Sequence, residues 1–162
     1  MSGKLRNMTA LYLIHGEQVL LLYRIGSKVA DKNYVGCAGG HFEKEELNDA
    51  QACVLRELRE ETGLTASDIK ELSMRYITMR LKNGEVRQNY YFFAELCDPE
   101  KTITSNEGVL SWVPLAEIDS LPMPQSAKCV LRHYRMCGRF DHALRGGVTE
   151  EDRVDFHILR EF

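Results

Sequence analysis

The 162-residue sequence lacks three features that would place it in a specialised class of protein. It has no excess of one charge, because 21 Lys and Arg oppose 24 Asp and Glu for a net charge of −3, which argues against a polybasic nucleic-acid clamp. Its five cysteines form no CxxC pair and are odd in number, which argues against a disulfide framework. No apolar run is long enough for a signal peptide or a membrane span. These absences predict a cytoplasmic protein with neither a membrane partner nor a stable nucleic-acid partner.

The chain also lacks internal repeats, low-complexity tracts and linkers rich in proline or glycine, so its length predicts a single domain over residues 1–162. Residues 138–162 contain two strand-like pieces, 139–145 and 153–161, joined by a polar segment. We expect a strand-rich C-terminal extension, either as a hairpin on the same domain or as a strand exchanged in a dimer. The oligomeric state is left open between monomer and homodimer.

Residues that favour β-strands dominate most of the chain before residue 125. The pattern predicts six strands: 8–15, 18–25, 35–38, 71–82, 86–96 and 110–113. The first two form a hairpin across Gly16 and Glu17. Asn83 and Gly84 predict a second hairpin, because this dipeptide favours a tight two-residue turn.

Two segments show helical periodicity instead. Between residues 48 and 62 the apolar side chains fall on one side of a 3.6-residue wheel. Asn48 and Gln51 resemble a capping box, and Gly63 stands where a left-handed C-cap is expected. A second full helix is expected at 125–137. Strands mixed with these helices predict an α+β fold, an α/β/α sandwich.

The first helix carries an unusual group of carboxylates. Glu57, Glu60 and Glu61 stand at i, i+3 and i+4, so they share one face of the helix. Like charges at that spacing destabilise a helix, and two of them oppose the macrodipole near its C-terminus. Hard divalent cations such as Mg²⁺ bind such groups of oxygens. The alternative interpretation is a solvated acidic face balanced by neighbouring arginines.

With the glycines 39–40 before it, this segment resembles the Nudix box, Gly-x5-Glu-x7-Arg-Glu-U-x-Glu-Glu-x-Gly-U, in which U is aliphatic. Residues 56–64 match every specified position of the second half, and Gly40 and Glu46 match the first half. Nine residues rather than seven separate the two halves, which we interpret as a two-residue insertion where the loop meets the helix. The insertion leaves the role of Glu46 open, since Glu45 could take its part.

The resemblance covers residues 8–137 and implies a Nudix fold, with a mixed sheet, the box helix and a C-terminal helix. It implies Mg²⁺ as the cofactor, with Mn²⁺ as a substitute. The implied metal ligands are Gly39, Glu57, Glu60, Glu61 and Glu107; the catalytic groups are Glu57 and Glu60; the substrate contact is Arg24; the structural residues of the box are Gly40, Glu46, Arg56 and Gly63. An ordinary loop glutamate and a sheet-edge arginine are the alternative interpretations of Glu107 and Arg24.

The same resemblance implies an enzyme that hydrolyses the diphosphate linkage of a nucleoside diphosphate derivative. The length, the short loops and the region around Trp112 look most like mutator-type, MutT-like members, which hydrolyse nucleoside triphosphates such as 8-oxo-dGTP. An asparagine that often reads the purine in those enzymes is replaced here by Ser126, so ADP-ribose or another nucleoside diphosphate derivative is the alternative substrate. A non-catalytic nucleotide-sensing module is a further alternative, which the three box glutamates disfavour.

Overall fold

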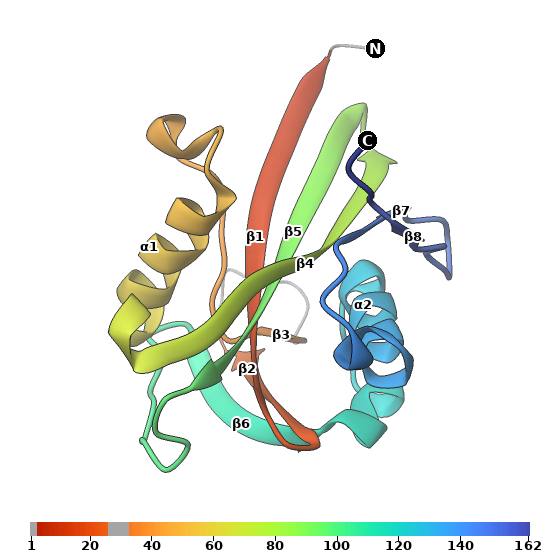
Figure 1. The fold of residues 1–162 in the computed structure, drawn as a ribbon. Coiled ribbons are helices and arrows are strands. Elements are labelled where there is room, and N and C mark those ends of the chain that lie inside the picture. The colour runs from red at the N-terminus through yellow and green to blue at the C-terminus, as the bar shows by residue number, and fades with distance from the viewer. Residues whose placement is uncertain (1–2, 26–32) are drawn as a thin grey trace.

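In the computed structural model, which describes residues 3–25 and 33–162, strands β1 (Lys4–His15) and β5 (Glu85–Leu96) pair in parallel inside one mixed sheet (Figure 1). The other strands are β2 (Gln18–Arg24), β3 (Tyr34–Gly36), β4 (Ile69–Lys82), β6 (Gly108–Pro114), β7 (Arg145–Val148) and β8 (His157–Ile158). Their order across the sheet is β3-β2-β1-β5-β4-β7-β8, with β6 paired to β2.

One α-helix covers each face of this sheet (Figure 1). The helices are α1 (Ala50–Thr62) and α2 (Gln125–Met136). Successive side chains of β1 point alternately toward the two helices. Leu11 and Leu13 pack in the core beneath α1, whereas Tyr12 and Ile14 pack in the core beneath α2. This two-sided burial confirms the α+β sandwich that the sequence predicts. In residues 3–25 and 33–162 no helix is long and apolar enough to cross a membrane.

Helix α1 begins at Ala50, one residue later than an N-cap at Asn48 would place it, because its N-cap is Asp49. The Oδ1 atom of Asp49 accepts a hydrogen bond from a backbone N–H of the first turn at 2.9 Å. The predicted capping box of Asn48 and Gln51 is therefore wrong. At the other end Gly63 adopts a φ of 74°, the left-handed C-cap that the sequence predicts.

Both predicted hairpins are present. Asn83 and Gly84 adopt φ values of 55° and 74°, which produce the tight turn between β4 and β5. The strand predicted at 35–38 ends at Gly36, and the strand predicted at 110–113 lies within the longer β6. Local turn chemistry thus predicts the order of these strands, while their ends depend on pairing with neighbours.

The strand predicted at 139–145 is wrong. Gly138–Phe140 form a short 3₁₀ helix, and β7 begins only at Arg145. The cause is Asp141, whose carboxylate accepts hydrogen bonds from both terminal nitrogens of Arg145, at 2.9 and 2.5 Å, and so holds the chain in a turn. The strand predicted at 153–161 is reduced to the two residues of β8. Strand β7 pairs in parallel with β4, so this extension continues the main sheet.

Asp141 is also the counter-ion of two buried arginines, Arg75 and Arg145, each 6% exposed. Hydrogen bonds from Arg145 hold the pKa of Asp141 well below its usual range. Because the folded-state pKa is lower than the unfolded-state value, the contribution to stability is present above about pH 4 and is lost as the pH falls below it. We expect Asp141→Asn to lower the free energy of unfolding at pH 7 by about 1–3 kcal/mol.

Urea unfolding of both proteins between pH 2 and 7 tests this expectation, since the difference between them should shrink as the pH falls. A constant difference across that range would assign the acid sensitivity to other carboxylates.

Candidate functional site

The segment between β3 and α1, residues 37–49, carries Gly39, Gly40 and Glu46 and is called the glycine loop here. The side chain of Arg56 connects this loop to α1. Its Nε and Nη2 atoms donate hydrogen bonds to the two carboxylate oxygens of Glu46, at 2.6 and 3.0 Å. Its Nη1 atom donates to Glu57 at 2.8 Å and to Glu60 at 3.0 Å. Nη2 also donates to the backbone carbonyl of His41 at 3.0 Å. The extra two residues of the loop therefore leave Glu46 beside Arg56, where it forms a bidentate ion pair.

Glu46 is buried, with 7% of its surface exposed, although most glutamates lie in water. The hydrogen bonds from Arg56 lower the pKa of Glu46 to about 2, so the carboxylate stays charged at neutral pH. Glu45, the other candidate for this position, is exposed. The structure thus brings Glu46, and not Glu45, to the box arginine.

We expect Glu46→Ala to lower both stability and activity. Without Glu46, Arg56 loses its bidentate partner, which corresponds to roughly 1.5–3 kcal/mol of unfolding free energy. Arg56 is then free to bind Glu57 and Glu60 more closely, which withdraws them from any ligand. Glu45→Ala is the matched control and should resemble the wild type in both melting temperature and rate. A Glu46→Ala protein as stable and active as this control would rule out the positioning role.

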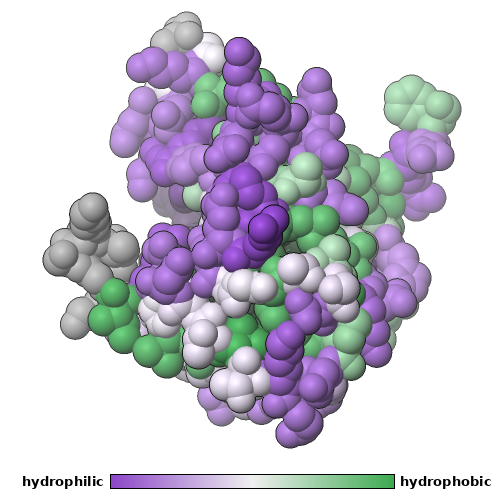
Figure 2. All heavy atoms as spheres, turned by 90° about the vertical axis from the view of Figure 1, so that its left-hand side faces the viewer, coloured by the Kyte–Doolittle hydropathy of each residue, from purple (hydrophilic) through white to green (hydrophobic). Residues whose placement is uncertain are grey.

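The three glutamates of α1 have different surroundings. Hydrophilic side chains cover much of the surface on the α1 side of the molecule (Figure 2), and the Glu60 side chain there is 56% exposed. The Glu57 side chain is only 13% exposed. Glu61 is turned toward the glycine loop, where its Oε2 atom accepts a hydrogen bond from the backbone N–H of Gly39 at 3.3 Å. Glu57 and Glu61 thus lie on the inner side of the helix, and Glu60 lies on its outer side.

Negative charge is concentrated around Glu61. Burial, followed by the charge of Glu57, raises the pKa of Glu61 to about 7, and Glu107 contributes in the same direction. Glu107 comes from the loop before β6. Its neighbour Asn106 donates hydrogen bonds to the backbone carbonyls of Glu60 and Glu61, at 3.1 and 3.2 Å. This cap on the last turn of α1 brings the loop to the site. Sequence reasoning missed Asn106, because a polar loop residue carries no local signal of such a contact.

The glycines of the loop lie too close to their neighbours for any side chain. A Cβ atom at Gly39, where φ is 155°, would overlap the backbone carbonyl of Thr9. At Gly40 a Cβ atom would overlap the carboxylate of Glu57. The two glycines therefore serve different purposes: Gly39 lets the loop approach β1, and Gly40 leaves room for the Glu57 carboxylate.

Within the described ranges no three His, Cys, Asp or Glu side chains are already grouped as a metal site. Arg56 holds Glu57 and Glu60, and Glu61 faces Gly39. The donor set still fits a hard divalent cation, because it consists of carboxylate oxygens. Such a cation would relieve the repulsion from Glu57, which adds to burial in raising the pKa of Glu61. The metal-binding role of these residues stays a prediction.

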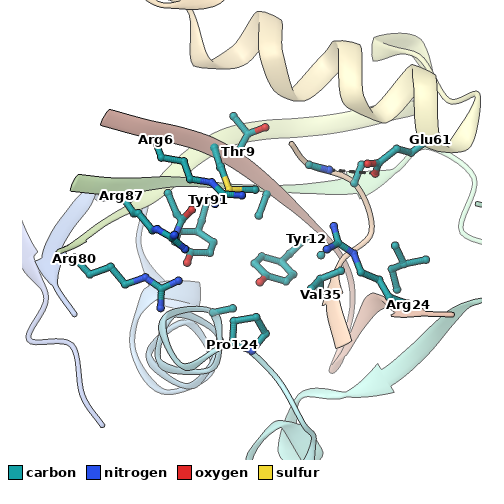
Figure 3. A pocket seen from close by; sticks show the side chains of 18 residues that line it. Arg6, Thr9, Tyr12, Arg24, Val35, Glu61, Arg80, Arg87, Tyr91 and Pro124 are labelled. Atoms are coloured by element: carbon teal, nitrogen blue, oxygen red, sulfur yellow. Dashed lines mark hydrogen bonds between the residues drawn. The ribbon is translucent and has the colours of Figure 1, made fainter. Parts of the chain in front are cut away.

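A cavity of about 260 Å³ lies between the sheet and the N-terminal end of α2. Glu61 and Arg24 lie at one end of it, and Arg6, Arg80 and Arg87 lie at the other (Figure 3). The rest of its lining includes Met8, Ala10, Tyr12, Asn89 and Tyr91. The cavity therefore connects the carboxylates of the box helix to a group of arginines that sequence reasoning missed. A signal existed, because Arg80 and Arg87 are equally distant from the Asn83–Gly84 turn and must be cross-strand partners.

Comparison with known proteins identifies the family of this chain. The family model for the NUDIX domain matches residues 4–134. The mutator MutT protein of Bacillus halodurans is 23% identical, with a TM-score of 0.64 over 94% of this chain and 97% of that one. An Ap4A hydrolase of C. elegans is 17% identical, with a TM-score of 0.60 over 81% and 96%. A NUDIX hydrolase from Nitrosomonas europaea is 14% identical, with a TM-score of 0.67 over 92% and 81%. At these identities the solved structures show a shared fold.

Proposed function

The chain belongs to the NUDIX domain family, and from this premise we propose that it hydrolyses the diphosphate linkage of a nucleoside diphosphate derivative with the help of Mg²⁺. The enzyme class expected from the sequence, a Nudix pyrophosphohydrolase, agrees with the family and with the fold shared with Nudix hydrolases. One observation carries the proposal: Glu61 belongs to the carboxylate cluster of α1 and also lines the arginine-bearing cavity. A nucleotide in this cavity would therefore have its phosphates beside the carboxylates.

In this proposal the cation is held by Gly39, Glu57, Glu60, Glu61 and Glu107, and Mn²⁺ can replace Mg²⁺. When bound, the cation would neutralise charge on the diphosphate oxygens, which makes the phosphorus atom more electrophilic toward water. Arg24, at the same end of the cavity, is placed to bind a phosphate oxygen.

Glu57 is the proposed general base. Among the described residues, Arg56 donates to its Oε1 atom, which orients the carboxylate and leaves Oε2 to accept a proton from water. Gly40 provides the space in which this carboxylate lies. Arg56 acts as a positioning residue, since it connects Glu46 to Glu57 and Glu60.

The proposed substrates are nucleoside triphosphates, including oxidised ones such as 8-oxo-dGTP, or ADP-ribose and other nucleoside diphosphate derivatives. Ser126 bears on this choice. Its hydroxyl shares a hydrogen bond of 2.8 Å with Thr149 of the C-terminal extension, and Ser126 is not part of the cavity lining. Because Ser126 is engaged by Thr149 and lies outside the cavity lining, we propose that other residues recognise the base of the substrate.

A screen for product release over nucleotides, with and without Mg²⁺, tests the proposal. We expect hydrolysis of at least one nucleotide only when the cation is present. Millimolar Mg²⁺ should also raise the melting temperature, because it binds the folded state, and Glu61→Gln should remove most of that rise. Glu117→Gln, a change at an exposed glutamate, is the control. Nucleotide binding without turnover, together with an equal Mg²⁺ effect in both variants, would instead indicate a sensing module.

A further inference from the structure

Three arginines lie side by side on adjacent strands, at the end of the cavity opposite to Glu61 and Arg24. Arg6 of β1 is the register partner of Arg87 of β5, and Arg87 is in turn the partner of Arg80 of β4. Directly paired residues project from the same face of a sheet, and all three line the cavity (Figure 3). Like charges in this arrangement repel one another and destabilise the sheet. We call these three residues the arginine row.

The described residues compensate little of this charge. Arg87 has a carboxylate partner, Glu85, at 3.1 Å. Arg6 contacts the ring of His41 at 3.0 Å, and its Nε atom is buried without a hydrogen-bond partner. The Nε atom of Arg80 is also buried without one. A buried donor without an acceptor is costly. Among the described residues neither Arg6 nor Arg80 forms an ion pair with a carboxylate, so an anion in the cavity would compensate their charge.

The arginine row lies about the length of a nucleoside along β1 from the glycine loop that Glu61 contacts. The backbone N–H of Thr9 donates to the carbonyl of Gly40 at 2.9 Å, so the glycine loop lies beside Thr9. Arg6 precedes Thr9 by three residues on the same strand, which corresponds to roughly 10 Å. A ligand with its diphosphate next to Glu61 would therefore extend along β1 and end at the arginine row.

We propose that the arginine row binds a second phosphate of the substrate, at the end remote from the diphosphate that is hydrolysed. This inference rests on the proposed function and specifies its substrate class: nucleoside diphosphate derivatives with a further phosphate, either on the ribose or farther along a polyphosphate chain. Guanidinium groups suit this task, because their planar donors match phosphate oxygens in bidentate contacts and keep their charge.

Matched pairs of substrates test the inference. ADP-ribose and its 2′-phosphate, and GTP and its 3′-diphosphate derivative, examine a phosphate on the ribose. Diadenosine triphosphate and diadenosine tetraphosphate examine a phosphate in a longer chain. With Mg²⁺, the wild type should show a kcat/KM at least ~10-fold higher for the phosphate-bearing member of one pair. Which pair shows the preference identifies where the second phosphate is carried.

Arg80→Gln should lower kcat/KM for the preferred member by ~10–100-fold, as expected for loss of a charged hydrogen bond. Its melting temperature should equal or exceed that of the wild type, because repulsion from Arg87 is removed. Arg6→Gln is a second variant with the same expected loss. Arg132→Gln changes a half-buried arginine of α2 that is paired with Asp119, outside the cavity lining, and should leave the preference intact.

A preference that survives both Arg80→Gln and Arg6→Gln would overturn the inference, as would equal kcat/KM values within every pair. Calorimetry in EDTA separates this result from a failure of the proposed function. The phosphate-bearing member of a pair should bind the wild type more tightly than its partner, and Arg80→Gln should abolish the difference. Such binding without any hydrolysis would support the arginine row and contradict the enzymatic proposal, whereas equal or undetectable binding of both members would contradict the arginine row.

Discussion

Glu57→Gln is expected to lower kcat by at least ~10²-fold while nucleotide binding changes by a few-fold at most. Glutamine has nearly the same shape as glutamate and can still accept the hydrogen bond from Arg56, but it cannot take a proton from water. The fold should be unaffected, since the substitution removes one of the charges that raise the pKa of Glu61. Steady-state kinetics, calorimetry and thermal melting measure the three quantities.

Glu117→Gln serves as the control, because Glu117 is exposed and lies in the 3₁₀ helix Leu115–Ser120, outside the box. A loss of stability without a loss of rate would make Glu57 a structural residue. A rate close to that of the wild type would move the general base to another carboxylate, with Glu60 or Glu107 as the next to examine.

Gly40→Ala is the second change for which we expect a large effect. The new methyl group would overlap the carboxylate of Glu57, which must then leave its place beside Arg56. Displacement of a catalytic group by about 1 Å can cost ~10²-fold in rate, and we expect a loss of that size in kcat. The backbone at Gly40 does not require a positive φ, so the loss should come from the displaced carboxylate rather than from backbone strain.

The matched control is Gly146→Ala in β7, where a methyl group would touch only the side chain of Leu159, at 3.4 Å. This control should keep its rate and its melting temperature. If Gly40→Ala is as active as the control, the reaction does not depend on the position of the Glu57 carboxylate beside Arg56. That result would contradict the assignment of Glu57 as the general base.

Sequence alone could predict the features that depend on near neighbours. The turn at Asn83–Gly84 and the C-cap at Gly63 both follow from residues within a few positions of one another. The N-cap differs from the prediction by one residue, because Asn48 and Asp49 are both good caps and only the fold selects between them.

The features that sequence could not predict depend on distant parts of the chain. The turn at residue 141 replaces a predicted strand because Asp141 accepts hydrogen bonds from Arg145 and forms an ion pair with Arg75. Arg75 lies in β4, more than 60 residues earlier in the chain. The contact between Glu46 and Arg56 depends on how the loop with the two-residue insertion folds. The arginine row needs the pairing of β1 with β5, which no local pattern reveals.

The parallel pairing of β1 with β5 also has a consequence for how the protein folds. Lys4 pairs with Glu85, so the middle of the sheet closes a loop of about 80 residues, which costs chain entropy before any contact compensates for it. Helix α1 lies inside this loop, and β7 adds another non-local pairing to β4. Folding should accordingly be slow for a chain of this size. In a refolding experiment, enzymatic activity should return together with protection of the β1 and β5 amides from hydrogen exchange, since the cavity does not exist until those strands meet.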